Sequence, residues 1–155
     1  MNILQKITLC CLLLLITVSC TKDETSLGVV MARGIKISVL NQEGKDLLNP
    51  TDSTGFKESE IKIFYVKDGE LVEFFRGNYD WPKGYFIYKG KSNYVIRILL
   101  DANPAINPTT TYIQWSPTDM DTITAKYRFR GQSVLADEIW VNSQPKTKAV
   151  FELVK

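Results

Sequence analysis

Aromatic side chains concentrate between Phe74 and Gly90, in the stretch FFRGNYDWPKGYFIYKG. Tyr79, Trp81 and Tyr85 stand there among Asn, Asp, Pro and Gly residues, which favour turns. Aromatic rings present flat apolar faces with polar edges, and such surfaces suit a sugar or a partner protein. These three residues are therefore the candidate ligand-binding set. The alternative is that the aromatics of GYFIYK belong to the core and that Trp81 covers one end of the fold.

Catalytic chemistry has little support in the sequence. The chain has no histidine, so the commonest general base and metal ligand is missing. Asp52, Asp68, Asp80, Asp119 and Asp121 could supply oxygen ligands, but their spacing matches no complete calcium loop, and turn chemistry accounts for the last two. A pair of carboxylates brought together by the fold is the remaining catalytic alternative. We predict no enzyme activity, no cofactor and no bound metal.

The charge balance argues against nucleic acid as a partner. Nineteen basic and seventeen acidic residues leave a net charge of +2, whereas nucleic-acid binding usually requires a strong positive patch. The 155 residues suffice for one domain, and the 45% hydrophobic content suffices for a core.

The N-terminal segment has the pattern of a secretory signal. Lys6 precedes an apolar run, Ile7 to Ile16, that is too short to cross a bilayer core, which needs about twenty residues. A buried helix or a membrane anchor is the alternative. Cys10 and Cys11 lie inside this segment, so Cys20 is the one cysteine left after cleavage. Its place at the end of the signal indicates an attachment point; the alternative is a free thiol after ordinary cleavage.

The string TVSC, ending at Cys20, resembles the lipobox of bacterial lipoproteins, although Thr17 stands where that family favours Leu. The resemblance implies that Cys20 is lipidated and becomes the first residue of the mature chain. Each buried methylene contributes about 0.8 kcal/mol, so two or three acyl chains would hold the protein to a membrane.

The residues after Cys20, CTKDET, resemble the lipoprotein export signal of Bacteroidetes. The match is carried by Lys22, Asp23 and Glu24. The resemblance implies an outer-membrane protein that faces the cell exterior. A charged flexible tether on the periplasmic face is the alternative.

The rest of the chain must position the aromatic residues, and it has the pattern of an all-β domain. Asp68-Gly69 favours a type I′ hairpin turn between two of the expected strands. All six prolines fall in expected connections. Nine short runs of strand-forming residues are separated by turn chemistry: GIKISVL, EIKIFYV, LVEFF, GYFIYK, NYVIRILLD, TTYIQW, DTITAKYRFR, EIWVN and AVFELV.

Two of these runs contain basic residues that need an explanation. In Thr122 to Arg130, apolar residues alternate with polar and basic ones, so Lys126, Arg128 and Arg130 share one face with Thr122 and Thr124. That face is either a site for an acidic ligand or lipid headgroup, or a solvated face whose charges block edge pairing. NYVIRILLD is more apolar and predicts a central strand, in which Arg97 needs a partner or a route to solvent.

A second resemblance covers most of the mature chain. The strings ISVLNQEGKDLLNPTD, IKIFYVKDGELVE, TTTYIQWSPTDMDTITAKYR and IWVNSQ resemble small Bacteroidetes surface lipoproteins with an immunoglobulin-like or transthyretin-like β-sandwich. It implies a fold and a location and transfers no functional residue.

The sequence therefore predicts a signal peptide over 1–19, a lipidated cysteine and tether over 20–33, and a single antiparallel β-sandwich over 34–155. The expected function is a non-catalytic binding or accessory module on the outer membrane. The alternatives are a glycan-binding protein of a nutrient-uptake system and a structural subunit of a surface or fimbria-like assembly.

Overall fold

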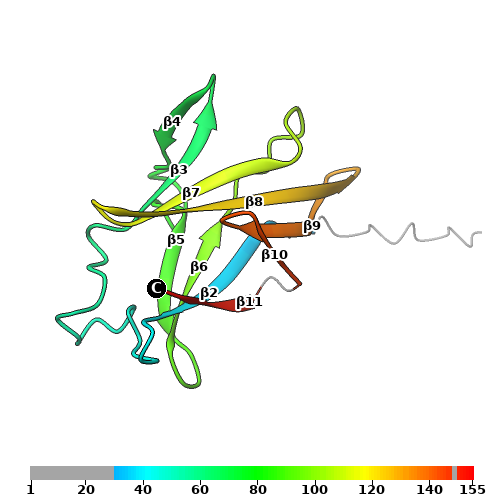
Figure 1. Cartoon of the computed structure of the whole chain (residues 1–155). Coiled ribbons are helices and arrows are strands. Elements are labelled where there is room, and N and C mark those ends of the chain that lie inside the picture. Colours follow the sequence, from blue (N-terminus) through cyan, green and yellow to red (C-terminus); the bar gives the residue numbers. More distant parts are fainter. Residues whose placement is uncertain (1–29, 148–149) are drawn as a thin grey trace, which may run out of the picture.

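The computed structural model describes residues 30–147 and 150–155, and this part of the chain is all-β. The expected signal peptide, Cys20 and Lys22 to Glu24 lie outside the described residues. The strands form one sheet of seven strands and one of four, which lie against each other in Figure 1.

The seven-stranded sheet has the order β1-β9-β8-β7-β3-β4, and β10 pairs with β9 beside β1. Its strands are β1 (Met31–Ala32), β3 (Lys62–Lys67), β4 (Glu70–Glu73), β7 (Thr109–Ser116), β8 (Asp119–Arg130), β9 (Ser133–Val141) and β10 (Gln144–Lys146).

The four-stranded sheet has the order β11-β2-β6-β5. Its strands are β2 (Gly34–Leu40), β5 (Tyr85–Lys89), β6 (Tyr94–Leu99) and β11 (Val150–Val154). The strand NYVIRILLD therefore lies inside its sheet, as predicted, because β6 is flanked by β2 and β5.

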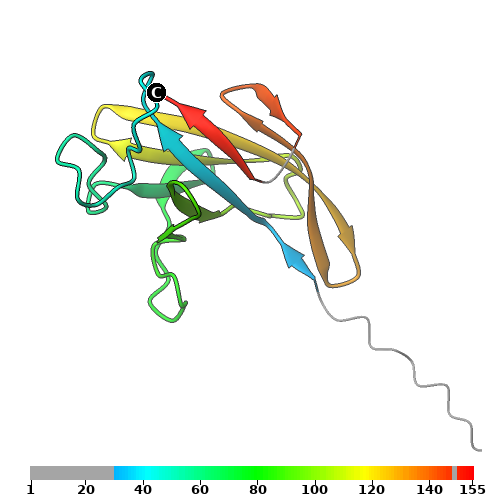
Figure 2. The same cartoon turned by 90° about the horizontal axis from the view of Figure 1, so that it is seen from below.

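Both sheets are mixed, which differs from the predicted antiparallel arrangement. β11 runs parallel to β2, as Figure 2 shows for the blue and red strands, and β1 runs parallel to β9. All other strand pairs in the described part of the chain are antiparallel. Each parallel pair joins strands far apart in the sequence, so no short turn has to reverse the chain between them.

The core contains inward-facing residues of both sheets. Ile35, Ile37 and Val39 alternate with more exposed residues along β2, and they belong to one buried cluster with Ile113 and Trp115 of β7. This is the period-two pattern of strands buried on one face. The outward-facing residues of each strand are therefore the ones available to build a site.

All nine predicted runs overlap strands, and the predicted hairpin is present. Asp68 and Gly69 have φ angles of 52° and 86°, which a type I′ turn requires, and they connect β3 to β4. The structure adds β1 and β10, which the sequence analysis did not predict. Pro145 lies inside β10 rather than in a connection; this short strand occupies a sheet edge, where proline is tolerated.

A β-bulge shapes the edge of the larger sheet. Lys126 pairs with Glu138 but Tyr127 pairs with Ala136, so Asp137 is an extra residue in β9. Asp137 and Glu138 are consequently both exposed, although neighbours in a regular strand face opposite sides. The bulge thus places two successive carboxylates beside the basic face of β8.

Candidate functional site

The segment between β4 and β5, Phe74–Gly84, forms a hydrogen-bonded loop that we call the aromatic loop. The amide of Arg76 donates to the carbonyl of Pro82 at 2.8 Å, which closes the base of the loop. Inside it, Tyr79 N donates to Arg76 O at 3.1 Å and Gly84 N donates to Trp81 O at 2.9 Å. These bonds give the loop a defined shape without a helix or strand.

Phe74 and Gly84 attach the loop to the core. Gly84 has a φ of +78°, and a Cβ there would lie 2.7 Å from Cδ1 of Phe74, so only glycine fits. The ring of Phe74 packs against Tyr65 at a centroid distance of 4.9 Å and against Tyr79 at 6.1 Å. The side chain of Tyr79 is thereby supported on one side by the core.

Trp81 packs over the outward-facing residues of the four-stranded sheet. Its ring centroid lies 4.4 Å from that of Phe86 in β5. The guanidinium carbon of Arg97 in β6 lies 5.2 Å from the Trp81 ring, within cation–π range. Phe86 and Arg97 are paired across the two strands. The indole is therefore the contact that Arg97 needs in its largely apolar strand.

Gly34 lies on the other side of Arg97. A Cβ on Gly34 would lie 3.2 Å from Nε and 3.7 Å from Nη2 of Arg97. The arginine side chain therefore passes close over bare backbone of β2. Together, Gly34 and Trp81 restrict the position of the guanidinium.

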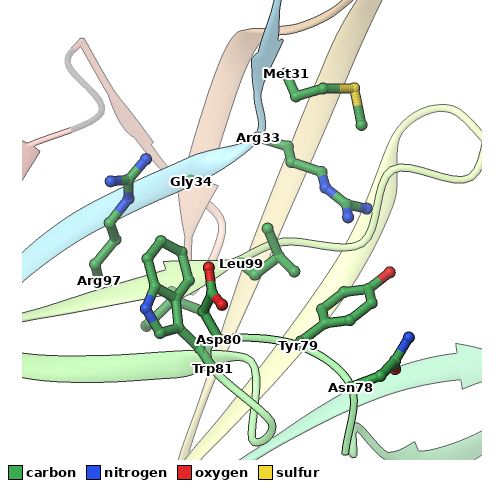
Figure 3. A pocket seen from close by; sticks show the side chains of 10 residues that line it. Met31, Arg33, Gly34, Asn78, Tyr79, Asp80, Trp81, Arg97 and Leu99 are labelled. Carbon is green, nitrogen blue, oxygen red and sulfur yellow. The ribbon is translucent and has the colours of Figure 1, made fainter. Parts of the chain in front are cut away.

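An open pocket of about 460 Å³ lies beside these residues, a size typical of ligand sites. Arg97 extends from β6 beside Trp81, and Arg33, which lies between β1 and β2, is on the side of Tyr79, as Figure 3 shows. The lining contains two guanidinium groups and one carboxylate, that of Asp80. The lining residues are Met31, Arg33, Gly34, Asn78, Tyr79, Asp80, Trp81, Arg97, Ile98 and Leu99.

Two of the three candidate residues meet in this pocket. Tyr79 is 43% exposed and Trp81 is half-buried. Tyr85 is 5% exposed, and its hydroxyl donates inward to the carbonyls of Glu58 at 2.9 Å and Ile61 at 3.2 Å. Burial raises the pKa of Tyr85 to about 12. Tyr85 therefore packs in the core and reaches only the wall of a second hollow, of about 440 Å³, which shares Asp80 and Trp81 with the pocket.

Arg33 and Arg97 are not among the site residues predicted from the sequence. Arg33 was assigned to the tether, but the structure places Met31–Ala32 in β1 and Arg33 in the pocket. Its carbonyl accepts a hydrogen bond from Leu100 N at 3.0 Å, which attaches the residue to the end of β6. The charge of Arg97 inside an apolar strand was the signal that could have identified the site.

Two of the carboxylates considered as metal ligands, Asp119 and Asp121, are instead partnered by side chains of the fold. Asp121 is 5% exposed and accepts hydrogen bonds from Trp115 Nε1 at 2.6 Å and Asn142 Nδ2 at 2.7 Å. Lys155 Nζ lies 2.6 Å from both Asp119 and Asp121. Turn chemistry does not explain Asp121, which is a buried, fully partnered carboxylate. No group of three or more Cys, Asp or Glu residues in the described ranges could hold a metal ion.

Two opposing effects act on the pKa of Asp121. Burial raises it, but hydrogen bonds from Asn142, Lys155 and Trp115 lower it, and the net pKa lies below its usual value. Asp121 therefore stays ionised in the folded protein at neutral pH.

Two of the three basic residues on the basic face of β8 are paired within the chain. Lys126 Nζ lies 2.6 Å from Glu138, and Arg128 forms an ion pair with Asp137. β8 lies between β7 and β9, so these charges do not protect a sheet edge. The face is solvated, as one of the two predicted alternatives states, but its charges serve cross-strand pairing.

No protein family, curated protein or solved structure matches this chain. Within residues 30–147 and 150–155, no helix has the length and apolar character that a membrane span requires.

Proposed function

We propose that this chain is a non-catalytic lipoprotein of the outer membrane, anchored through Cys20, that binds a glycan in the pocket beside the aromatic loop. The two mixed sheets with a common core support a single β-sandwich of the immunoglobulin-like or transthyretin-like kind. In this proposal the sandwich is a rigid support and the loop supplies the binding surface.

The observation that carries the glycan proposal is the composition of the pocket. Tyr79 and Trp81 offer aromatic surface, while Asn78, Asp80 and the two arginines offer hydrogen-bonding groups around one opening. Sugars present apolar C–H faces and hydroxyl groups, so they match this combination better than a purely apolar ligand would.

Surface anchoring rests on the N-terminal signals. Lipidated Cys20 would attach the chain, and Lys22, Asp23 and Glu24 would direct it outward. Protease treatment of intact cells tests this, with a Lys22→Ala, Asp23→Ala, Glu24→Ala variant as the comparison. We expect degradation of the wild-type domain and protection of the variant. Protection of both, when lysed cells show degradation, would favour the periplasmic face.

Glycan binding is tested by calorimetric titration of the full-length protein in detergent with a panel of host and dietary polysaccharides. We expect saturable binding that Trp81→Ala reduces at least about tenfold, because the variant loses the apolar surface that the ring would bury against the sugar, at about 25 cal/mol per Å². Trp140→Ala is the matched control, since Trp140 is also half-buried but lies in β9 of the other sheet. Equal loss in both variants would contradict the proposed site.

A structural subunit is the second candidate, and one observation favours it. β4 is the outer strand of its sheet, and all four of its residues are exposed, including Leu71 at 46% and Val72 at 40%. An exposed edge with apolar residues can accept a strand from another protein. Stoichiometric co-purification of a partner that Val72→Lys abolishes, together with no binding across the glycan panel, would support this role.

A further inference from the structure

We propose that the pocket selects anionic glycans, whose carboxylate or sulfate groups are bound by Arg33 and by Arg97 on the two sides of the pocket. This inference rests on the proposed glycan-binding function and adds the class of sugar. The shared chemistry is an oxyanion on a sugar ring, and both arginines offer planar groups of N–H donors that match it.

The first argument is that Arg33 and Arg97 have no direct ionic partner among the described residues. Asp101 is a carboxylate that interacts with the charge of Arg33 at longer range. Both side chains are half-buried, so each guanidinium has lost part of its water shell. An arginine in this condition gains more from a ligand oxyanion than a fully solvated one.

The second argument is that Arg97 is held in place before any ligand binds. Its guanidinium carbon lies 5.2 Å from the Trp81 ring, and its Nε lies 3.2 Å from the position of a Cβ on Gly34. Binding therefore orders little of this side chain, which favours affinity. The same indole that orients Arg97 contributes aromatic surface to the pocket.

The third argument is an unfavourable charge arrangement around the site. Lys36 of β2 lies directly opposite Arg97 of β6. On the other side of β2, Lys36 is paired with Val150 of β11. Like charges directly opposite each other destabilise a sheet. A bound anion would relieve this repulsion.

Asp80 is the one carboxylate in the lining, and it opposes an anionic ligand. Two arginines and one aspartate leave one net positive charge in the pocket. The proposal thus makes a distinctive prediction: Asp80→Asn removes repulsion and raises the affinity for an anionic sugar, whereas for a neutral sugar it removes a hydrogen-bond acceptor and lowers the affinity.

The test compares two matched pairs of ligands with the full-length protein in detergent, by calorimetry at low salt. The pairs are an oligogalacturonate with its methyl ester, and a sulfated galactan oligosaccharide with its desulfated form. We expect the charged member of at least one pair to bind at least about tenfold more tightly, since a hydrogen bond to a charged group contributes about one to two factors of ten. The pair that discriminates identifies the anion as carboxylate or sulfate.

Variants locate the effect. Arg97→Gln and Arg33→Gln are expected to remove the preference for the charged ligand, and Arg97→Lys is expected to retain part of it. Lys91→Gln is the control for a lost positive charge, because Lys91 is exposed in the β5–β6 turn, at the opposite end of these strands from the pocket. Thermal unfolding of each variant shows whether its fold is retained.

The outcomes separate this inference from the proposed function. Equal affinity within both pairs, or Trp81-dependent binding of neutral polysaccharides alone, would overturn the anion preference and leave glycan binding standing. No binding of any charged or neutral sugar would overturn both. A preference for the charged ligand that Lys91→Gln reduces as much as Arg97→Gln would also overturn the proposed site.

Discussion

Basic residues lie on the outer faces of both sheets, but their surroundings differ. On β8 of the seven-stranded sheet, Lys126 and Arg128 form ion pairs with Glu138 and Asp137 of β9. On the four-stranded sheet, Lys36 and Arg97 lie opposite each other, and the described residues provide neither with an ion pair. Lys126 and Arg128 are therefore balanced by their own fold, although Arg130 at the end of β8 has no ion pair among the described residues. Lys36 and Arg97, in contrast, leave positive charge uncompensated beside a pocket.

This difference shows how to distinguish a charged surface from a candidate site. Exposed ion pairs contribute about 0–1 kcal/mol each, so those on β8 serve mainly solubility and pairing. An uncompensated pair of like charges destabilises the sheet, and such local conflicts are typical of functional positions. The contrast therefore supports placing function on the four-stranded sheet.

The largest expected effect concerns the buried carboxylate of the seven-stranded sheet. Asp121→Ala removes the acceptor for Trp115 Nε1 and Asn142 Nδ2 and one partner of Lys155. We expect a loss of about 3 kcal/mol or more in the free energy of unfolding, measured by urea titration, because buried partners are left unsatisfied. Asp119→Asn, a change at the more exposed partner of Lys155, should cost less than about 1 kcal/mol. Equal losses would contradict a dominant role for burial.

The same carboxylate predicts a loss of stability in acid. The pKa of Asp121 is lower in the folded protein than its usual value of about 3.9, so its stabilisation is fully present above that pH and is lost as pH falls through the folded pKa. Urea unfolding between about pH 5 and pH 2 should show a smaller loss for Asp121→Asn than for the wild type. An equal loss of unfolding free energy in Asp121→Asn and in the wild type would show that other groups cause the acid sensitivity.

The next effect should appear in binding and not in stability. Gly34→Ala places a methyl group 3.2 Å from Arg97 Nε, so the Arg97 side chain must shift by a few tenths of an ångström relative to Trp81. We expect about a tenfold loss of affinity for the charged glycan with less than about 1 kcal/mol change in stability. Calorimetry and urea unfolding measure the two quantities. Unchanged affinity would show that the site does not depend on this position of Arg97.

A smaller effect of opposite sign is expected at Lys36. Lys36→Thr removes the repulsion with Arg97 and introduces a residue that favours strands. We expect an increase of about 0.2–1 kcal/mol in the free energy of unfolding at low salt, and a smaller increase at high salt because ions screen the repulsion. A decrease in stability would contradict the view that this charge pair is unfavourable.

The smallest effect is expected on the balanced face. Lys126→Thr removes one ion pair, with Glu138, and should reduce stability by about 0–1 kcal/mol without changing glycan affinity. It is the matched counterpart of Lys36→Thr, because both change an outward-facing lysine of a strand. A change of the same sign and size in both variants would remove the distinction between the two faces.

The sequence predicts those parts of the fold that follow from local patterns. Alternation in Thr122 to Arg130 correctly predicts which side chains are buried, and Asp68-Gly69 correctly predicts the hairpin. The first half of β9 was missed because the bulge at Asp137 interrupts the alternation. β1 is not predictable from the sequence because two residues are too few to show an alternating pattern. Its pairing with Val134 and Leu135 is also long-range.

The site is less predictable than the strands. Aromatic composition identified Tyr79 and Trp81, but it also selected Tyr85. The side chain of Tyr85 is buried because of its position in β5. Arg33 joins the pocket only because β2 lies beside β6, which is a property of sheet order and not of local sequence. Arg97 gave a local signal, because it is a charged residue in an apolar run. Its contact with Trp81 of the aromatic loop could not be predicted from sequence spacing.

The parallel pairing of β2 with β11 has a consequence for how the chain reaches its fold. One edge of β2 finds its partner strand only at the other end of the described chain, and such distant contacts form slowly. Until β11 pairs with it, β2, which is rich in Ile and Val, has an unpaired edge. Such an edge is a site for intermolecular association. Refolding should therefore be slow and concentration-sensitive, and a factor that shields β2 during export would raise the yield of folded protein.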